Sequence, residues 1–156
     1  MLTTMSVLAV LLAIASPGLA SLTSANALSS AQGELTAAMM LARGEALKRG
    51  VAVGLLATSP VGGSEFNGGW TVFVDANGNG LLDAGEPIVR VQPAFRGDMH
   101  VTTTGGQTLL AFSGRGFLTP SVPVTFTLCS GLATKSYRIR VEPVGLTDVT
   151  EATGCP

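Results

Sequence analysis

Charged residues are scarce in this sequence, and histidine is almost missing. Only 12% of the 156 residues are Asp, Glu, Lys or Arg, and the formal net charge is −1. Such a chain has no overall field that attracts nucleic acid or acidic substrates, so binding of that kind needs a local patch. The one histidine, His100, lies in a strand-like stretch, and no Ser-His-acid set, HExxH or GxxxxGK[ST] motif accompanies it. The sequence therefore predicts a protein that is not an enzyme and requires no cofactor.

The apolar run near the N-terminus is short for a membrane-spanning helix. Residues 5–15, MSVLAVLLAIA, carry no charge, but about 20 apolar residues are needed to cross a bilayer. A secretory signal peptide is one interpretation, because the run has the length of an h-region and small residues follow it. Against it, no Lys or Arg precedes the run, and the sequence beyond it continues as a helix.

The pattern beyond the run indicates one long helix. Apolar residues recur at three-, four- and seven-residue steps, and the final basic turn before Gly50 suits a helix C-terminus. We expect a helix kinked at Pro17, apolar in residues 1–21 and amphipathic in residues 22–50. Its apolar stripe consists of Leu28, Leu35, Met39, Ala42 and Ala46.

Four other residues of the expected helix bear on what it contacts. Glu34 and Glu45 are typical of a solvated face or of partner contacts. Gly33 and Gly44 would each weaken an isolated helix by about 1 kcal/mol, so we hypothesise that another helix packs closely there. Normal assembly of a Gly44→Leu variant would count against this hypothesis.

The spacing of apolar residues changes after Gly50. Short apolar or alternating runs, separated by Gly, Pro, Ser and Asn, are typical of strands. Seven such runs cover residues 51–56, 70–74, 88–91, 99–103, 109–112, 124–128 and 137–141. They predict an α+β protein in which the long helix is followed by an antiparallel β-sheet domain, residues 51–156.

An acidic loop lies between two of these runs. From Asp75 to Glu86 it matches the calcium-loop pattern D-x-[DN]-x-[DN]-G-x5-E. The candidate calcium ligands are Asp75, Asn77, Asn79, the Leu81 carbonyl, Asp83 and Glu86. However, strands flank this loop where an EF-hand has helices, and Asn-Gly and Asp-Ala-Gly are equally typical of a long hairpin turn. A calcium site and a turn without metal both remain open.

Longer stretches of the sequence carry a family resemblance. They are LAVLLAIASPGLASL, LSSAQGELTAAMMLARGEALKRG, GWTVFVDANGNGLLDAGEPIVRVQPA, LAFSGRGFLTP, VTFTLC and the closing GCP. With these stretches the chain resembles the GspH/FimT family of type IV pilin-like proteins over nearly its whole length. The resemblance implies a type IV pilin-like fold in a minor pilin of a type IV pilus, which primes or caps filament assembly. A GspH-like minor pseudopilin of a type II secretion system is the alternative within the family.

The resemblance also implies how such a protein is made and placed. Family members are prepilins whose basic leader is cut before a Phe-Thr-Leu-Ile-Glu segment, and the new N-terminus is methylated. That segment is missing here, and if Pro17 is the family's kink proline, Met1 falls just past the family's conserved glutamate. We therefore expect that the true start lies upstream or that the chain is a fragment; the missing residues would bring the apolar run to spanning length. The expected location is the inner membrane, single-pass, with the globular domain in the periplasm.

Partners follow from the same resemblance. Other pilins would contact the N-terminal helix in the filament after assembly. Some pilin-like proteins hold calcium in loops between strands, which favours calcium in the acidic loop.

An alternative interpretation from a different class of protein is a secreted calcium-binding β module whose first 20 residues are removed.

The chain has two cysteines, Cys129 and Cys155. The exported setting that the resemblance implies favours a disulfide between them, which would stabilise the fold by roughly 3 kcal/mol. Metal binding would lack a second pair of ligands, and a catalytic thiol would need a nearby histidine and acid.

DNA is a further candidate partner, because some FimT-type minor pilins bind it during natural transformation through a Gly-Arg-x-Arg motif. The corresponding place here, residues 145–148, reads GLTD and has neither arginine. The candidate DNA contacts that remain are Arg115, Lys135, Arg138 and Arg140. Arg138 and Arg140 share a strand face and could form a basic strip with Lys135; an ordinary solvated face is the alternative. So few cations predict weak DNA binding.

Overall fold

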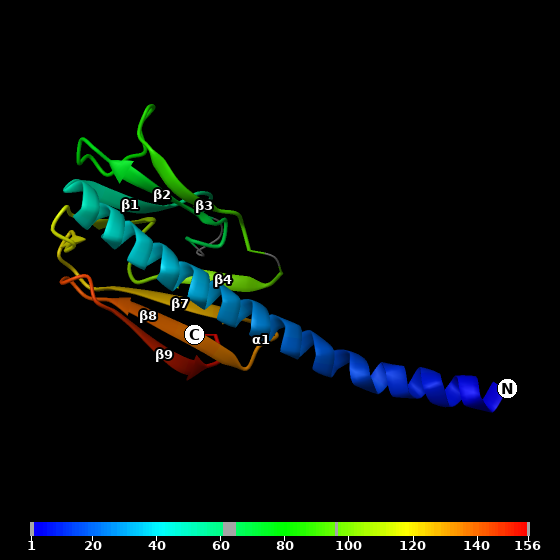
Figure 1. Ribbon diagram of the computed structural model, residues 1–156. Coiled ribbons are helices and arrows are strands. Elements are labelled where there is room, and N and C mark those ends of the chain that lie inside the picture. The colour runs from blue at the N-terminus through cyan, green and yellow to red at the C-terminus, as the bar shows by residue number, and fades with distance from the viewer. Residues whose placement is uncertain (1, 61–64, 96, 156) are drawn as a thin grey trace.

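The protein consists of one long helix packed against two antiparallel sheets (Figure 1). The computed structural model describes the backbone of residues 2–60, 65–95 and 97–155, and their side chains from Ser21 onward. Helix α1 spans Leu2–Arg49. The strands are β1 (Ala52–Ala57), β2 (Trp70–Asp75), β3 (Ile88–Gln92), β4 (Met99–Thr103), β5 (Leu109–Phe112), β6 (Leu118–Thr119), β7 (Val124–Ser130), β8 (Lys135–Val141) and β9 (Thr147–Thr153). The predicted α+β class is confirmed.

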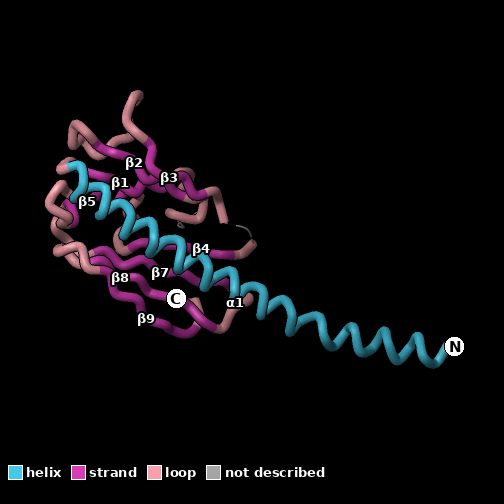
Figure 2. Tube along the Cα trace, in the orientation of Figure 1, coloured by secondary structure: helices cyan, strands magenta, loops and turns pink. Residues whose placement is uncertain are grey.

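Helix α1 continues through Pro17 without interruption. Its N-terminal part projects away from the sheets, and its C-terminal part lies across them (Figure 2). The helix ends as the sequence predicts: Gly50, with φ 69°, donates its N–H to the Ala46 carbonyl over 2.8 Å. In the described part of the chain, no helix includes a stretch apolar enough to cross a membrane.

The first sheet has the strand order β3-β2-β1-β5-β6, and the second has the order β4-β7-β8-β9. Neighbouring strands are antiparallel throughout; for example, Ala52 pairs with Asp75, and Arg140 pairs with Asp148. Each of the seven predicted runs forms a strand, and β7 and β8 extend beyond their predicted ends. Strands β6 and β9 were not predicted. The prediction missed β9 because most of its side chains are exposed, so it has no apolar alternation.

The core lies between the buried face of α1 and the two sheets. The predicted stripe is confirmed, since each of its five side chains is fully buried. The first sheet contributes buried residues such as Leu55 and Phe112, and the second contributes Phe126 and Ile139. The first buried side chain that the structure describes is Leu28. The helix is thus tied to the β domain from that residue onward.

Candidate functional site

The β2–β3 loop brings the predicted calcium ligands into one hydrogen-bonded turn. Asp75 closes β2 with only 3% of its surface exposed. One of its carboxylate oxygens accepts the amides of Gly78 and Asn79 over 2.7 and 3.1 Å. The other accepts the Gly80 amide over 2.9 Å. Asp75 thus fixes the tight part of the loop through backbone donors.

The other acidic side chains also accept hydrogen bonds inside the loop. The side-chain amides of Asn77 and Asn79 donate to Asp83 Oδ2 over 2.8 and 2.7 Å. These two hydrogen bonds, that of Asn77 first, hold the pKa of Asp83 below its ordinary value. Glu86 accepts the amides of Ala76 and Asp83 over 2.9 and 3.0 Å.

The arrangement is that of a well-bonded turn. The Leu81 amide donates to Asn79 Oδ1 over 2.7 Å, while the Leu81 side chain is exposed. Within the described residues, no group of three or more His, Cys, Asp or Glu side chains is placed to hold a metal ion. The calcium site stays a prediction.

The four candidate DNA contacts differ in the strand face they occupy and in whether they pair with acidic side chains. Lys135 pairs with Glu151 on β9, whose hydrogen bond and charge raise the pKa of Lys135. By strand alternation Lys135 shares a face of β8 with Ile139, opposite the face of Arg138 and Arg140. The three cations therefore do not form the strip that we considered.

The two arginines of β8 differ in their pairing. Arg140 donates from Nε to Glu142 over 2.6 Å and stands opposite Asp148 on β9. Arg138 and Arg115, the latter exposed in the β5–β6 turn, pair with no acidic side chain in the part of the chain that the structure describes. DNA contact at these residues stays a prediction.

A disulfide joins Cys129 and Cys155, as predicted. It ties the tail after β9 to the end of β7. His100 lies opposite Cys129 in the β4–β7 ladder, and these residues line a hollow of about 390 Å³.

Arg43 has a structural role that was not predicted from the sequence. Its Nε donates to the Gly116 carbonyl over 3.1 Å, and its Nη2 donates to the Val144 carbonyl over 3.0 Å. The helix is thereby joined to the β5–β6 and β8–β9 turns. The position of this charged residue beside the apolar stripe was the available signal, but the stripe does not show which turns Arg43 contacts.

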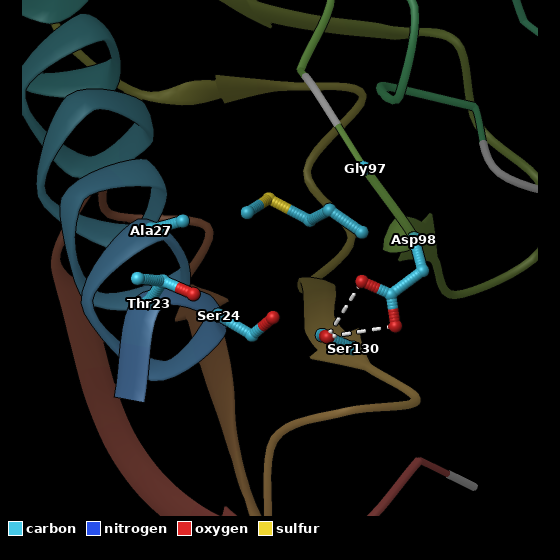
Figure 3. Close-up of a pocket in the computed structure, with 7 residues that line it drawn as sticks. Thr23, Ser24, Ala27, Gly97, Asp98 and Ser130 are labelled. Atoms are coloured by element: carbon cyan, nitrogen blue, oxygen red, sulfur yellow. Dashed lines mark hydrogen bonds between the residues drawn. The ribbon is translucent and has the colours of Figure 1, made fainter. Parts of the chain in front are cut away.

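A second hollow, of about 220 Å³, lies beside α1 near the point where the helix leaves the sheets (Figure 3). Ser24 points from the helix toward Ser130 and Asp98. The Asp98 carboxylate accepts the Ser130 hydroxyl over 3.0 Å at each oxygen and the Leu132 amide over 3.0 Å. Burial alone would raise the pKa of Asp98, but these donors, with nearby backbone amides, hold it below the ordinary value. Asp98 is therefore a fixed anion beside the hollow.

Comparison with known proteins agrees with this architecture. The sequence model of the family described as Type II transport protein GspH matches residues 31–145. The chain belongs to this family of pilin and pseudopilin subunits, as the resemblance implied. No curated protein matches the chain.

Solved structures share the fold. The type IV minor pilin FimU of Pseudomonas aeruginosa is 22% identical with a TM-score of 0.65, and the match covers 83% of this chain and 92% of FimU. The minor pseudopilin EpsH from the Type 2 Secretion System of Vibrio cholerae is 12% identical with a TM-score of 0.58, covering 79% of this chain and 95% of EpsH. The type IV pilin-like fold is thus confirmed, and the family implies assembly with other pilins in a filament.

Proposed function

We propose that this protein is a minor pilin that primes or caps a type IV pilus. The supporting observation is the division of α1: its N-terminal part projects beyond the sheets, and from Leu28 onward it is packed into the core (Figure 1). No residue before Glu34 carries a charge. Such a surface is stable in lipid or against neighbouring helices rather than in water. The projecting part would hold the subunit in the inner membrane, with the β domain in the periplasm, and then enter the filament core.

A minor pseudopilin of a type II secretion system is the second candidate. The description of the matching family and the likeness to EpsH both favour it. Both candidates need the same helix and the same β domain, so the fold supports them equally.

A clean deletion of the gene separates these two functions. If the protein is a minor pilin, the deletion should lower the number of surface pili counted by electron microscopy and leave secretion of type II substrates unchanged. Returning the gene in its native reading frame should restore the number of pili. Loss of secretion with normal pili would instead identify the pseudopilin. If neither phenotype appears, our proposal is wrong.

DNA uptake would be an additional role of the same subunit. Its support is limited to Arg115 and Arg138, because Lys135 and Arg140 are paired with acids. We expect weak binding of the full chain, in non-ionic detergent, to fluorescent double-stranded DNA, with a shallow dependence on salt concentration. An Arg115→Ala, Arg138→Ala double variant should lose it, and Lys135→Ala should retain it. Equal binding by all three proteins would exclude these arginines as the contacts.

A further inference from the structure

The two residues of the disulfide differ in accessibility. Cys129 lies on β7 with only 5% of its surface exposed, whereas Cys155 is exposed on the tail after β9. The tail is tied to the β7–β8 turn by the Gly154 N–H, which donates to the Thr134 carbonyl over 3.0 Å. A Cβ added to Gly154 would have open space around it. A reagent in solution therefore reaches Cys155 more readily than Cys129.

The single histidine of the chain stands beside the buried cysteine. His100 on β4 and Cys129 on β7 are direct partners in the antiparallel ladder. Side chains paired in this way lie on the same face of the sheet with Cβ atoms about 5 Å apart, which is within reach of an imidazole. On the other side of Cys129, the β7–β8 register pairs Leu128 with Tyr137 and so places Ser136 next to Cys129. Ser136 is buried and His100 is exposed, so the open side of Cys129 is the side of His100.

The hollow of about 390 Å³ brings these groups to one surface. It is lined by His100, Thr102, Cys129, Gly131 and Cys155. A water molecule occupies about 30 Å³ in the liquid, so the hollow has room for an incoming thiol. Both cysteines and the histidine therefore border one space that a reactant can enter.

Burial decides which sulfur is attacked. A thiolate attacks a disulfide along the S–S axis, and the rate at each sulfur depends on access to it. Cys155 is approached from solvent across the exposed tail. The approach to Cys129 is restricted by β4 and β8, which flank its strand on both sides. The two cysteines are thus suited to different steps of an exchange reaction.

We propose that the Cys129–Cys155 bond is a thiol–disulfide exchange site that is entered at Cys155 and resolved at Cys129, with His100 as the proton carrier. The reactant is a partner protein whose own cysteine pair cycles between dithiol and disulfide. This inference goes beyond the proposed function and does not depend on it, because a pilus subunit and a secretion subunit would use the site alike.

Opening of the bond proceeds in two steps. A partner thiolate attacks Cys155 Sγ and forms a mixed disulfide, while the electron pair of the broken S–S bond leaves on Cys129 Sγ, which takes a proton from the His100 imidazolium. The partner's second thiolate then attacks the partner sulfur of the mixed disulfide and releases Cys155 as a thiolate. Cys155 and His100 regain protons from water. The disulfide of this chain gains the two electrons that the partner dithiol loses.

Closing reverses these steps. The Cys155 thiolate attacks the partner's disulfide, and one partner sulfur leaves as a thiolate. Neutral His100 then accepts the proton of Cys129, whose thiolate attacks Cys155 Sγ and expels the second partner thiolate. His100 would thus act on the resolving thiol in both directions.

Mapping the mixed disulfide tests the point of entry. The oxidised full chain in non-ionic detergent is treated briefly with reduced glutathione at pH 7, quenched with acid, cleaved at acid pH and mapped by mass spectrometry. We expect glutathione on Cys155 at least about tenfold more often than on Cys129. The smaller, uncharged 2-mercaptoethanol should give the same distribution. Modification mainly at Cys129, or equally at both cysteines, would overturn the proposal.

The closing reaction tests the roles of Cys129 and His100. Reduced protein is mixed with oxidised glutathione, and the Cys155 adduct and the closed disulfide are followed by acid quenching. Cys129→Ser should accumulate the adduct, and His100→Gln should slow its closure roughly tenfold. His100→Lys keeps a cation beside the Cys129 thiolate and should recover much of the rate. The control is Thr102→Val, which changes another side chain of the same hollow and should close like the wild type. Closure of His100→Gln at the wild-type rate, with native Trp70 fluorescence, would refute the assignment of His100.

Discussion

Arg43 shows how a single residue holds separate parts of this fold together. Its guanidinium reaches carbonyls in two turns that are distant from the helix in sequence, and it does so beside the buried stripe of α1. The two turns also touch each other, since a Cβ on Gly145 would lie 2.3 Å from the Gly116 carbonyl oxygen. These contacts fix the end of the domain farthest from the projecting helix.

Replacement of Arg43 by methionine should destabilise the protein by about 2 kcal/mol. Methionine retains much of the apolar stem, but it leaves the Gly116 and Val144 carbonyls without their charged donor. Denaturant unfolding of the full chain in detergent, followed by the fluorescence of Trp70, measures the change. Arg115→Met is the control and should alter stability by less than about 0.5 kcal/mol. Equal effects of the two variants would show that the bridge contributes nothing.

Two glycines with similar backbone angles should respond differently to alanine. Gly145 and Gly78 have φ values of 78° and 72°, so alanine is strained at both. A Cβ on Gly145 would also clash with the β5–β6 turn, whereas a Cβ on Gly78 would have open space around it. We expect a loss of about 1 kcal/mol for Gly78→Ala and at least twice that for Gly145→Ala, by the same unfolding measurement. Similar losses would mean that the turn yields without cost.

At the level of elements, the helix and most strands were predictable because their apolar periods are clear. Burial of one helical face gives the stripe in α1, and inward-facing residues give the alternation in strands such as β8. Strand β9 lacks this signal, since it joins the sheet edge mainly through backbone pairing with β8. The acidic loop was recognised from its spacing, but its internal hydrogen bonds depend on side-chain rotamers that spacing does not fix.

The helix glycines give a prediction that separates folding from assembly. At Gly44 the structure shows open space around an added Cβ, so Gly44→Ala should raise the free energy of unfolding by about 0.5 to 1 kcal/mol. Gly54→Ala in β1 should do the reverse, because its Cβ would lie 2.6 Å from the Phe73 ring. Gly44→Leu should fold but reduce filament number if another helix packs there. A filament number equal to wild type would refute the packing hypothesis.

The acidic loop offers a test by pH and by calcium. Removing both donors with Asn77→Ala and Asn79→Ala should raise the pKa of Asp83, as measured by NMR titration of its carboxyl carbon. Linkage gives the direction of the stability change with pH. Because the folded state lowers the pKa of Asp83, this carboxylate stabilises the fold at pH values above the ordinary pKa of aspartate. That stability is lost as the pH falls through the pKa of the folded state. Saturable calcium-induced shifts in the loop amides, weakened by Glu86→Gln, would establish the metal site. Their absence at millimolar calcium would leave the turn.

For the whole molecule, the disulfide is the link between the tail and the second sheet. It closes a segment with a sequence separation of 26, and the chain-entropy model assigns such a loop roughly 3 kcal/mol. The exported setting was sufficient to predict this pairing. The hollow beside Asp98 was not predictable, because it is formed by segments that meet only after α1 has packed on the second sheet.

Loss of the disulfide should therefore lower stability without changing the fold. We expect Cys155→Ser to reduce the free energy of unfolding by roughly 3 kcal/mol, and reduction of the wild-type protein to have the same effect. Amide spectra of the two forms should differ only near β7, β9 and the tail. A loss below about 1 kcal/mol would show that the edge strand holds the tail without the covalent bond.

The position of Leu28 as the first buried side chain among the described residues has a consequence for genetics. A substitution in the projecting part of α1 leaves the packed domain intact, so the subunit should accumulate normally and compete with wild-type copies for places in a filament. A substitution in the core lowers the folded fraction, and the unfolded chains are removed by proteases. Mutations of the first kind should act dominantly in a cell that carries both alleles, and those of the second kind recessively. The point at which helix packing begins thus marks where the inheritance of defects changes along the gene.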